Sequence, residues 1–162
     1  MTAMAGTPEN TSVKRVVLLM DDAERRKRLA EHPQAALVSE TLPLRANLSV
    51  AENITMVLQY RTNNFIGEAD EQAWELIRLL GCEACAHKRD PDLSHEERFI
   101  AKLLRAVVLR PALILIDRPA LLLPDTRYPQ FLNEILRVLE GRFEQCWILD
   151  YAWNKPLYEN RG

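Results

Sequence analysis

Apolar positions in this chain follow two periods, one typical of buried strands and one typical of helices. Four short apolar runs, each bounded by polar or turn-forming residues, predict strands. They cover residues 13–20, 35–39, 113–116 and 146–149. The third run, LILI, is apolar throughout, as expected for a central parallel strand that is covered on both faces. The pattern therefore predicts a parallel sheet.

Helical periods fill most of the sequence between these strands. They predict helices at residues 22–31, 49–60, 68–80, 94–110 and 129–139. Two helices begin with a capping box, in which a serine and the glutamate three residues later satisfy free backbone donors. These pairs are Ser49 with Glu52 and Ser94 with Glu97. Alternating strands and helices predict an α/β fold, here with a helical insertion at about residues 53–110.

The composition fits one compact domain. A length of 162 residues with 48% apolar residues is enough for a real core. We expect this domain to span residues 13–162, after a flexible N-terminus at residues 1–12. The formal net charge of −2 is mixed along the chain, which gives no support to a nucleic-acid or acidic-lipid partner. The basic run at residues 25–28 lies between Glu24 and Glu31, which favours a solvated helix face over an interaction patch.

Nothing in the sequence indicates membrane insertion or secretion. Its uncharged apolar runs fall well short of the ~18 residues of a membrane span, and the run at residues 16–20 is too short for a signal-peptide core. We therefore expect a cytoplasmic protein whose three cysteines are free thiols. Cys82, Cys85 and His87 resemble part of a metal clip, but a structural zinc site needs four ligands and no second pair is nearby. We expect no metal site.

The most informative stretch covers residues 93–125 and reads LSHEERFIAKLLRAVVLRPALILIDRPALLLPD. It resembles the consensus of ABC-transporter ATPases, LSGGQ-x-R-x-x-x-A-R-A-L-x-x-x-P-x-h-h-h-h-D-E-P-x-x-x-L-D, in which h is apolar. Upstream, LSVAENI at residues 48–54 resembles the region that follows the family's Q-loop. The resemblance covers about residues 35–151. It implies a partial P-loop NTPase fold of the ABC ATPase-like kind, a three-layer sheet with an inserted helical subdomain.

The resemblance assigns positions to the family's chemical groups, and most of these are changed. Ser94 keeps the signature serine, but His95 and Glu96 replace two glycines beside it. We therefore expect a structural helix cap rather than a phosphate site. Asp117 keeps the Walker B aspartate, whereas Arg118 replaces the catalytic glutamate. Because arginine cannot accept a proton at neutral pH, we expect it to pair with Asp117 in preference to a metal.

Two further family positions differ, and a third feature is missing. Glu40 takes the place of the Q-loop glutamine, where a carboxylate could touch a metal, although a surface acid is the favoured interpretation. Tyr151 takes the place of the switch histidine, and an ordinary tyrosine pKa of about 10 prevents it from acting as one. None of the five glycines fits a phosphate-binding loop, G-x-x-x-x-G-K-[ST]. Counting back places the family's lysine at or before the first residue, although the strand at 13–20 could fill the place of the phosphate-loop strand.

These departures predict a degenerate, N-terminally truncated ABC ATP-binding subunit that holds no ATP on its own. The favoured function is a non-catalytic pseudo-ATPase that docks on or regulates an ABC transporter. Its expected partners are the permease, an intact ABC ATPase subunit, or both, in the cytoplasm or at the cytoplasmic face of the membrane. No residue is predicted to be catalytic, and Ser94, Asp117 and Glu40 are the candidate nucleotide-binding positions.

Two alternatives remain at this point. The chain could be half of an asymmetric ATPase, in which Mg-ATP is held at a shared interface and Ser94 of the degenerate signature motif serves the partner's site. It could also be a cassette remnant that folds but has no present role.

Overall fold

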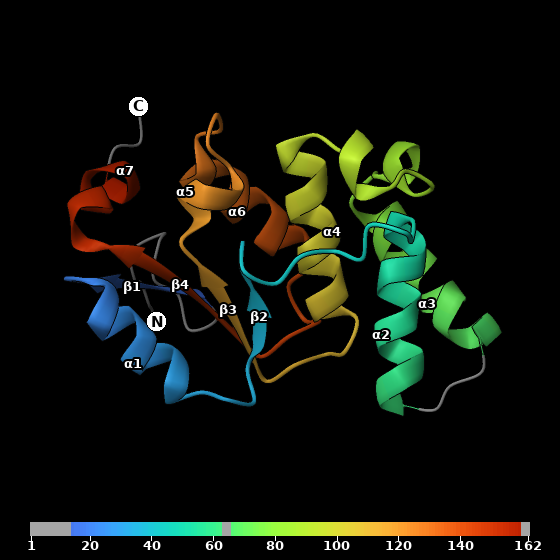
Figure 1. Cartoon of the computed structure of the whole chain (residues 1–162), viewed down its shortest axis with the longest axis horizontal. Coiled ribbons are helices and arrows are strands. Elements are labelled where there is room, and N and C mark those ends of the chain that lie inside the picture. The colour runs from blue at the N-terminus through green and yellow to red at the C-terminus, as the bar shows by residue number, and fades with distance from the viewer. Residues whose placement is uncertain (1–13, 63–65, 160–162) are drawn as a thin grey trace, which may run out of the picture.

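The structure, a computed structural model, describes residues 14–62 and 66–159. Within these residues its centre is a four-stranded parallel sheet in the order β1-β4-β3-β2 (Figure 1). The strands are β1 (Lys14–Leu19), β2 (Ala36–Val38), β3 (Leu113–Asp117) and β4 (Gln145–Tyr151). The four predicted strands are confirmed to within two residues at their ends. The flexible segment predicted at residues 1–12 lies outside the described residues.

Because the strands are parallel, their carboxyl ends lie along one edge of the sheet. The register aligns Leu19 of β1 with Tyr151 of β4, and Val38 of β2 with Ile116 of β3. In an open parallel α/β sheet, this is the edge at which ligands bind. Any functional site inherited from such a fold is therefore expected among the residues that follow the strands.

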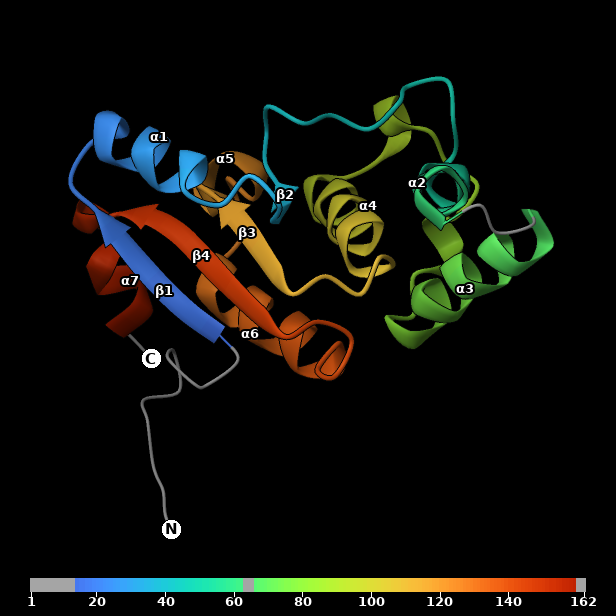
Figure 2. The same ribbon diagram turned by 90° about the horizontal axis from the view of Figure 1, so that it is seen from below.

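Helices cover both faces of the sheet (Figures 1 and 2). Helix α1 (Asp22–Ala30) lies on one face, where its Leu29 packs against Leu149 of β4. Helix α6 (Tyr128–Val138) lies on the other face and shares the main core with Ile148. Neighbouring residues of β4 thus point into opposite layers, as the two-residue period of a strand requires. This arrangement brings α1 alongside the carboxyl edge.

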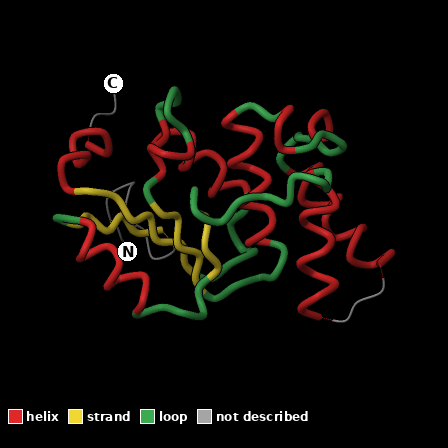
Figure 3. The backbone as a smooth tube through the Cα atoms, viewed as in Figure 1, coloured by secondary structure: helices red, strands yellow, loops and turns green. Residues whose placement is uncertain are grey.

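The chain between β2 and β3 is mostly helical (Figure 3). Its longer helices are α2 (Val50–Thr62), α3 (Ile66–Leu79) and α4 (His95–Val107). Both predicted capping boxes are present, since the Ser49 and Ser94 hydroxyls each accept a hydrogen bond at 3.1 Å from the backbone of the glutamate three residues later. Phe99 of α4 is fully buried and belongs to the same core as the sheet residues. Helix α4 therefore joins the helical part to the sheet.

Several short helices were not predicted from the sequence. They are α5 (Pro119–Leu122), α7 (Lys155–Glu159) and the single 3-10 turns η1 (Glu83–Cys85), η2 (Asp90–Asp92) and η3 (Ala152–Asn154). Each is too short to show a helical period in the sequence. No helix in the described part of the chain is long and apolar enough to cross a membrane.

Helix α4 ends earlier than its apolar pattern predicts. It was expected to reach Arg110, but it ends at Val107, and Arg110 has a φ of 49°. Pro111 follows, and the ring of a proline disfavours the right-handed helical region for the residue before it. The turn is closed instead by a hydrogen bond of 2.8 Å from the Arg110 N–H to the Val107 carbonyl.

Candidate functional site

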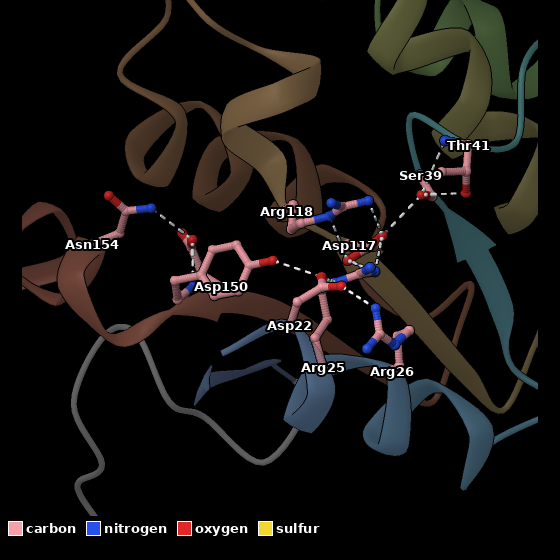
Figure 4. A network of polar contacts seen from close by, with 10 residues as sticks. Asp22, Arg25, Arg26, Ser39, Thr41, Asp117, Arg118, Asp150 and Asn154 are labelled. Atoms are coloured by element: carbon pink, nitrogen blue, oxygen red, sulfur yellow. Dashed lines mark hydrogen bonds and ion pairs between the residues drawn. The ribbon is translucent and has the colours of Figure 1, made fainter. Parts of the chain in front are cut away.

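Asp117, the last residue of β3, is the centre of a polar cluster at the carboxyl edge (Figure 4). Only 1% of Asp117 is exposed. Its carboxylate accepts hydrogen bonds from Arg25 Nη1, at 3.1 and 3.2 Å, and from Ser39 Oγ, at 2.9 Å. The Arg118 Nε lies 3.3 Å from the same carboxylate. We call Asp22, Arg25, Ser39, Asp117 and Arg118 the carboxyl-edge cluster.

The expected pairing of Asp117 with Arg118 is present, but the better-placed partner, Arg25, was not predicted. Arg25 Nη1 reaches both carboxylate oxygens, and only 11% of the Arg25 side chain is exposed. Arg118 reaches one oxygen through Nη2 at 3.4 Å, and its buried Nε is too poorly aligned to form a hydrogen bond with any described residue. The prediction of a solvated basic run is therefore wrong for Arg25. It holds for Arg26, whose side chain is 67% exposed.

Asp22 links Arg25 to β4. Its carboxylate accepts hydrogen bonds from Arg25 Nε at 2.8 Å and from the Tyr151 hydroxyl at 3.0 Å. These bonds, with that of Arg25 the larger influence, lower the pKa of Asp22. Burial by itself would lower the pKa of Arg25, but Asp22 and Asp117 together raise it, so the guanidinium stays charged. Tyr151 thus supports the carboxylate that orients Arg25.

The turn between β1 and α1 joins a strand to the N-terminus of a helix, which is the arrangement that a phosphate-binding loop has. Here Met20 and Asp21 make up the whole turn. Asp21 Oδ1 accepts a hydrogen bond of 2.9 Å from the Glu24 N–H, so a carboxylate of the chain already caps the helix. Asp21, Asp22 and Glu24 place negative charge where a phosphate would bind. These acidic residues do not fit the phosphates of Mg-ATP, and the guanidinium of Arg25 pairs with Asp117.

The turn that follows β2 is held by basic residues of α4. Lys102 Nζ donates to the Ser39 carbonyl at 3.1 Å, and Arg105 Nη2 donates to the Leu42 carbonyl at 2.7 Å. Burial lowers the pKa of Lys102 and of Arg105. Glu40 lies in this turn but is exposed, and it forms none of the ion pairs found in the described part of the chain. Its position agrees with a surface acid.

Ser94 lies at the exposed N-terminus of α4, and its side chain belongs to the helix cap. Glu97 Oε1 accepts a hydrogen bond of 2.9 Å from the Ser94 N–H, which completes the capping box. The neighbouring Glu96 accepts a hydrogen bond of 3.0 Å from Thr126 Oγ1. Of the candidate nucleotide-binding residues, only Asp117 lies in the carboxyl-edge cluster. Ser94 and Glu40 form no hydrogen bond with it among the described residues.

A second buried carboxylate, Asp150, was not predicted. Only 2% of it is exposed, and it accepts four hydrogen bonds, including the one from Asn154 that Figure 4 shows. The donors are the hydroxyls of Tyr128 and Tyr158, at 2.8 and 2.7 Å, Asn154 Nδ2 at 2.9 Å and the Tyr151 N–H at 2.8 Å. They join β4 to α6 and α7. The sequence does contain a signal for this residue, because Asp150 directly follows the apolar run WIL, just as Asp117 follows LILI.

The two buried tyrosines predict a loss of stability in alkaline solution. Burial and the neighbouring Asp150 raise the pKa of Tyr128 and of Tyr158 above the ordinary value of about 10. Because the folded state holds these protons more tightly, the stabilisation is complete below about pH 10 and is lost as the pH rises beyond it. We expect the urea midpoint to fall above about pH 10, and less steeply in the variant Tyr128→Phe. An equal slope in that variant would contradict this assignment.

The predicted free thiols are present at Cys82, Cys85 and Cys146. Among the described residues, no group of three or more histidine, cysteine, aspartate or glutamate side chains could hold a metal ion. The ring of His87 packs against Trp74 at a centroid distance of 5.4 Å.

Comparison with known proteins places part of the chain beside ABC ATP-binding proteins. It is 36% identical over 76 residues to the lipoprotein-releasing system ATP-binding protein LolD of Psychrobacter arcticus, a match that covers 47% of the chain and 34% of LolD. It is 36% identical over 81 residues to the phosphonates import ATP-binding protein PhnC of Chromohalobacter salexigens, covering 50% of the chain and 30% of PhnC. The chain thus spans about a third of the length of these curated relatives. No model of a known protein family matches it.

Solved structures agree on the fold. Two structures of the dimeric ATP-binding cassette MJ0796, one of them in a post-hydrolysis state bound to ADP and phosphate, align with a TM-score of 0.59 and 20% identity. The alignments cover 79% of the chain and 57% of the cassette. At this identity the likeness shows the fold alone, a partial P-loop NTPase fold with a parallel sheet, as predicted. The chain therefore has the fold of an ABC cassette over the aligned part and is similar over part of its length to the ATP-binding subunits of ABC transporters.

Proposed function

We propose that this chain is a non-catalytic ABC ATPase-like subunit that docks on or regulates an ABC transporter. The state of Asp117 carries the proposal, because its carboxylate is buried between the guanidinium groups of Arg25 and Arg118 and the Ser39 hydroxyl. A magnesium ion binds carboxylate and water oxygens in near-octahedral geometry. Two fixed cations against the same carboxylate would repel the ion and occupy the oxygens it needs.

The neighbouring positions also support a subunit without hydrolysis. An attacking water needs a group that accepts its proton, and the guanidinium of Arg118 stays protonated. The Arg118 backbone is left-handed, with φ 50° and ψ 69°, and its N–H donates to the Leu149 carbonyl at 2.9 Å. Tyr151 is engaged with Asp22. These contacts favour a protein that keeps the fold of a cassette without its chemistry.

The side of the molecule near the Q-loop-like turn offers a surface for a partner. A hollow of about 310 Å³ lies between β2, α2 and α4. Its lining includes Leu37, Leu42, Val57 and Leu109, together with the basic Arg105. In the family that the sequence resembles, the helices after the Q-loop dock on the transporter's membrane subunit. We therefore propose a permease at the cytoplasmic face of the membrane as the first partner.

An intact ATPase subunit is the second proposed partner. LolD and PhnC are ATP-binding proteins of a releasing and an import system, and the MJ0796 cassette is dimeric. A chain with the cassette fold could therefore pair with an intact cassette while contributing no hydrolysis of its own.

Calorimetric titration with Mg-ATP tests the proposal. The isolated chain should bind no nucleotide with a Kd below about 1 mM and release no phosphate, because Arg25 and Arg118 occupy Asp117. An intact ABC ATPase titrated in parallel serves as the positive control. Saturable binding or turnover by the chain alone would overturn the proposal.

The same assay with an intact ABC transporter, permease and ATPase subunits together, distinguishes docking from a shared ATP site. Ser94 is exposed at the N-terminus of α4. If the chain stimulates the partner's ATP hydrolysis through a shared site, that stimulation should disappear in Ser94→Arg. Stimulation through docking should survive Ser94→Arg and disappear in Leu42→Asp, since Leu42 is 43% exposed and lines the hollow. Leu157→Asp is the matched control, because Leu157 is 47% exposed but lies on α7.

A further inference from the structure

Cys82 and Cys85 are brought together by the turn that ends α3. The Gly81 N–H donates to the Arg78 carbonyl at 3.0 Å, and the Cys82 N–H donates to the Ile77 carbonyl at 2.9 Å. These two bonds form a Schellman motif, in which Gly81 adopts the required left-handed conformation with φ 67°. A single 3-10 turn follows, closed by a hydrogen bond of 3.1 Å from the Cys85 N–H to the Cys82 carbonyl. Residues at the two ends of such a turn have Cα atoms under about 7 Å apart, within the range a disulfide can bridge.

The two thiols differ in access but share one environment. Cys82 is partly exposed, whereas only 2% of Cys85 is exposed. Each thiol donates to a backbone carbonyl: Cys85 Sγ to that of Cys82 at 3.3 Å, and Cys82 Sγ to that of Leu80 at 3.5 Å. The proximity of the two sulfurs lowers the pKa of Cys85, and it raises the pKa of Cys82 together with burial.

We propose that Cys82 and Cys85 form a reversible dithiol–disulfide pair that reacts with small organic disulfides such as oxidised glutathione. Because Cys85 is buried, the partly exposed Cys82 attacks first, as a thiolate whose proton has passed to water, and its raised pKa makes this step slow at neutral pH. A Cys82–glutathione bond forms, the sulfur–sulfur bond of the oxidant breaks, and one reduced glutathione leaves. Cys85, deprotonated to water, then attacks the Cys82 sulfur and releases the second glutathione. The two cysteines lose two electrons and two protons in total, and one glutathione disulfide is reduced to two thiols.

The position of the pair links its redox state to the helical part of the molecule. Immediately after Cys85, the Ala86 and Lys88 carbonyls accept hydrogen bonds of 3.0 Å from the N–H groups of Ala51 and Val50, at the start of α2. Immediately before it, Cys82 caps α3. A disulfide at this turn would therefore fix the junction between α3 and α2. This inference is independent of the proposed function.

Equilibration of the folded full chain in glutathione buffers tests the proposal. After acid quenching and tryptic digestion, both cysteines lie on one peptide, residues 79–88, between the cleavage sites after Arg78 and Lys88. On oxidation we expect the mass of this peptide to fall by two hydrogens, with no glutathione added. The oxidised peptide should not react with a thiol-blocking reagent. The oxidised fraction should rise from a tenth to nine-tenths over about a hundredfold change in the ratio of squared reduced to oxidised glutathione.

The cysteine variants separate the roles of the two thiols. Cys85→Ser should accumulate a stable mixed disulfide with glutathione at Cys82, because nothing resolves it. Cys82→Ser should acquire no glutathione in the folded state, since Cys85 is buried. Cys146→Ser is the control and should behave as the unaltered chain, because Cys146 is fully buried in the core.

The unaltered chain by itself is enough to overturn the proposal, whether or not the variants fold. The proposal is wrong if peptide 79–88 keeps both thiols in all buffers. It is also wrong if the peptide carries glutathione at equilibrium and the internal disulfide does not form.

Discussion

Replacing Arg25 with methionine should lower the free energy of unfolding by about 3 kcal/mol, because it leaves Asp117 buried with much of its counter-charge removed. Asp117 is 1% exposed and accepts two of its hydrogen bonds from Arg25. Methionine keeps most of the apolar length of arginine, so packing changes little. Urea denaturation at neutral pH, followed by tryptophan fluorescence, measures the change as a lower midpoint at a constant m-value.

Arg26→Met is the matched control for this experiment. Arg26 is the next residue on the same helix, but it is 67% exposed and its ion pair is with the 44% exposed Asp22. Exposed pairs of this kind contribute less than about 1 kcal/mol. Adding Asp117→Asn to Arg25→Met should recover part of the lost stability, because it removes the unpaired buried charge. If Arg25→Met lowers the free energy of unfolding no more than Arg26→Met does, Arg25 is not the counter-charge that stabilises the buried Asp117.

Asp150→Ala should lower the free energy of unfolding by about 4 kcal/mol. The change leaves the hydroxyls of Tyr128 and Tyr158, Asn154 Nδ2 and the Tyr151 N–H without the acceptor they share in a buried site. A buried donor that loses its acceptor costs about 1–3 kcal/mol, and the losses are only partly additive because the donors can move toward one another. Thermal or urea unfolding of the purified variant provides the measurement.

Asp150→Asn distinguishes lost hydrogen bonds from lost volume. Asparagine fills the same space, and its amide can donate to the phenol oxygens of Tyr128 and Tyr158 while its carbonyl accepts from Asn154 and the Tyr151 backbone. We therefore expect it to cost about 1–2 kcal/mol, well below the alanine variant. Equal losses in the two variants would show that the carboxylate's hydrogen bonds contribute little there.

Features encoded by neighbouring residues were predicted well from the sequence. The two capping boxes join residues three positions apart, so the pattern alone identified them. The pairing of Asp117 with Arg118 followed from their adjacency and from the chemistry of arginine. The strands were evident because a buried parallel strand is a continuous apolar run.

The partners of the two buried carboxylates could not be predicted in the same way. Arg25 and Asp117 are separated by 92 positions, and nothing in the charged sequence of α1 distinguishes Arg25 from Arg26. Only the packing of α1 on the sheet decides which of the two points inward. The donors to Asp150 come from separate elements, and the helix that carries Tyr158 is only five residues long. Tertiary packing, rather than local pattern, therefore assigns these polar contacts.

The position of β4 in the sheet determines when the fold can be completed. It is the last strand along the described chain, yet it lies between β1 and β3, so residues 14–19 find their pairing partners only at residues 146–151. Contacts this distant in sequence slow folding, whereas the helical segment before β3 can form early from local contacts. During synthesis, β1 and α1 remain without β4 until residues 145–151 have emerged from the ribosome. A chain interrupted before β4 would therefore expose apolar strand surface and depend on chaperones.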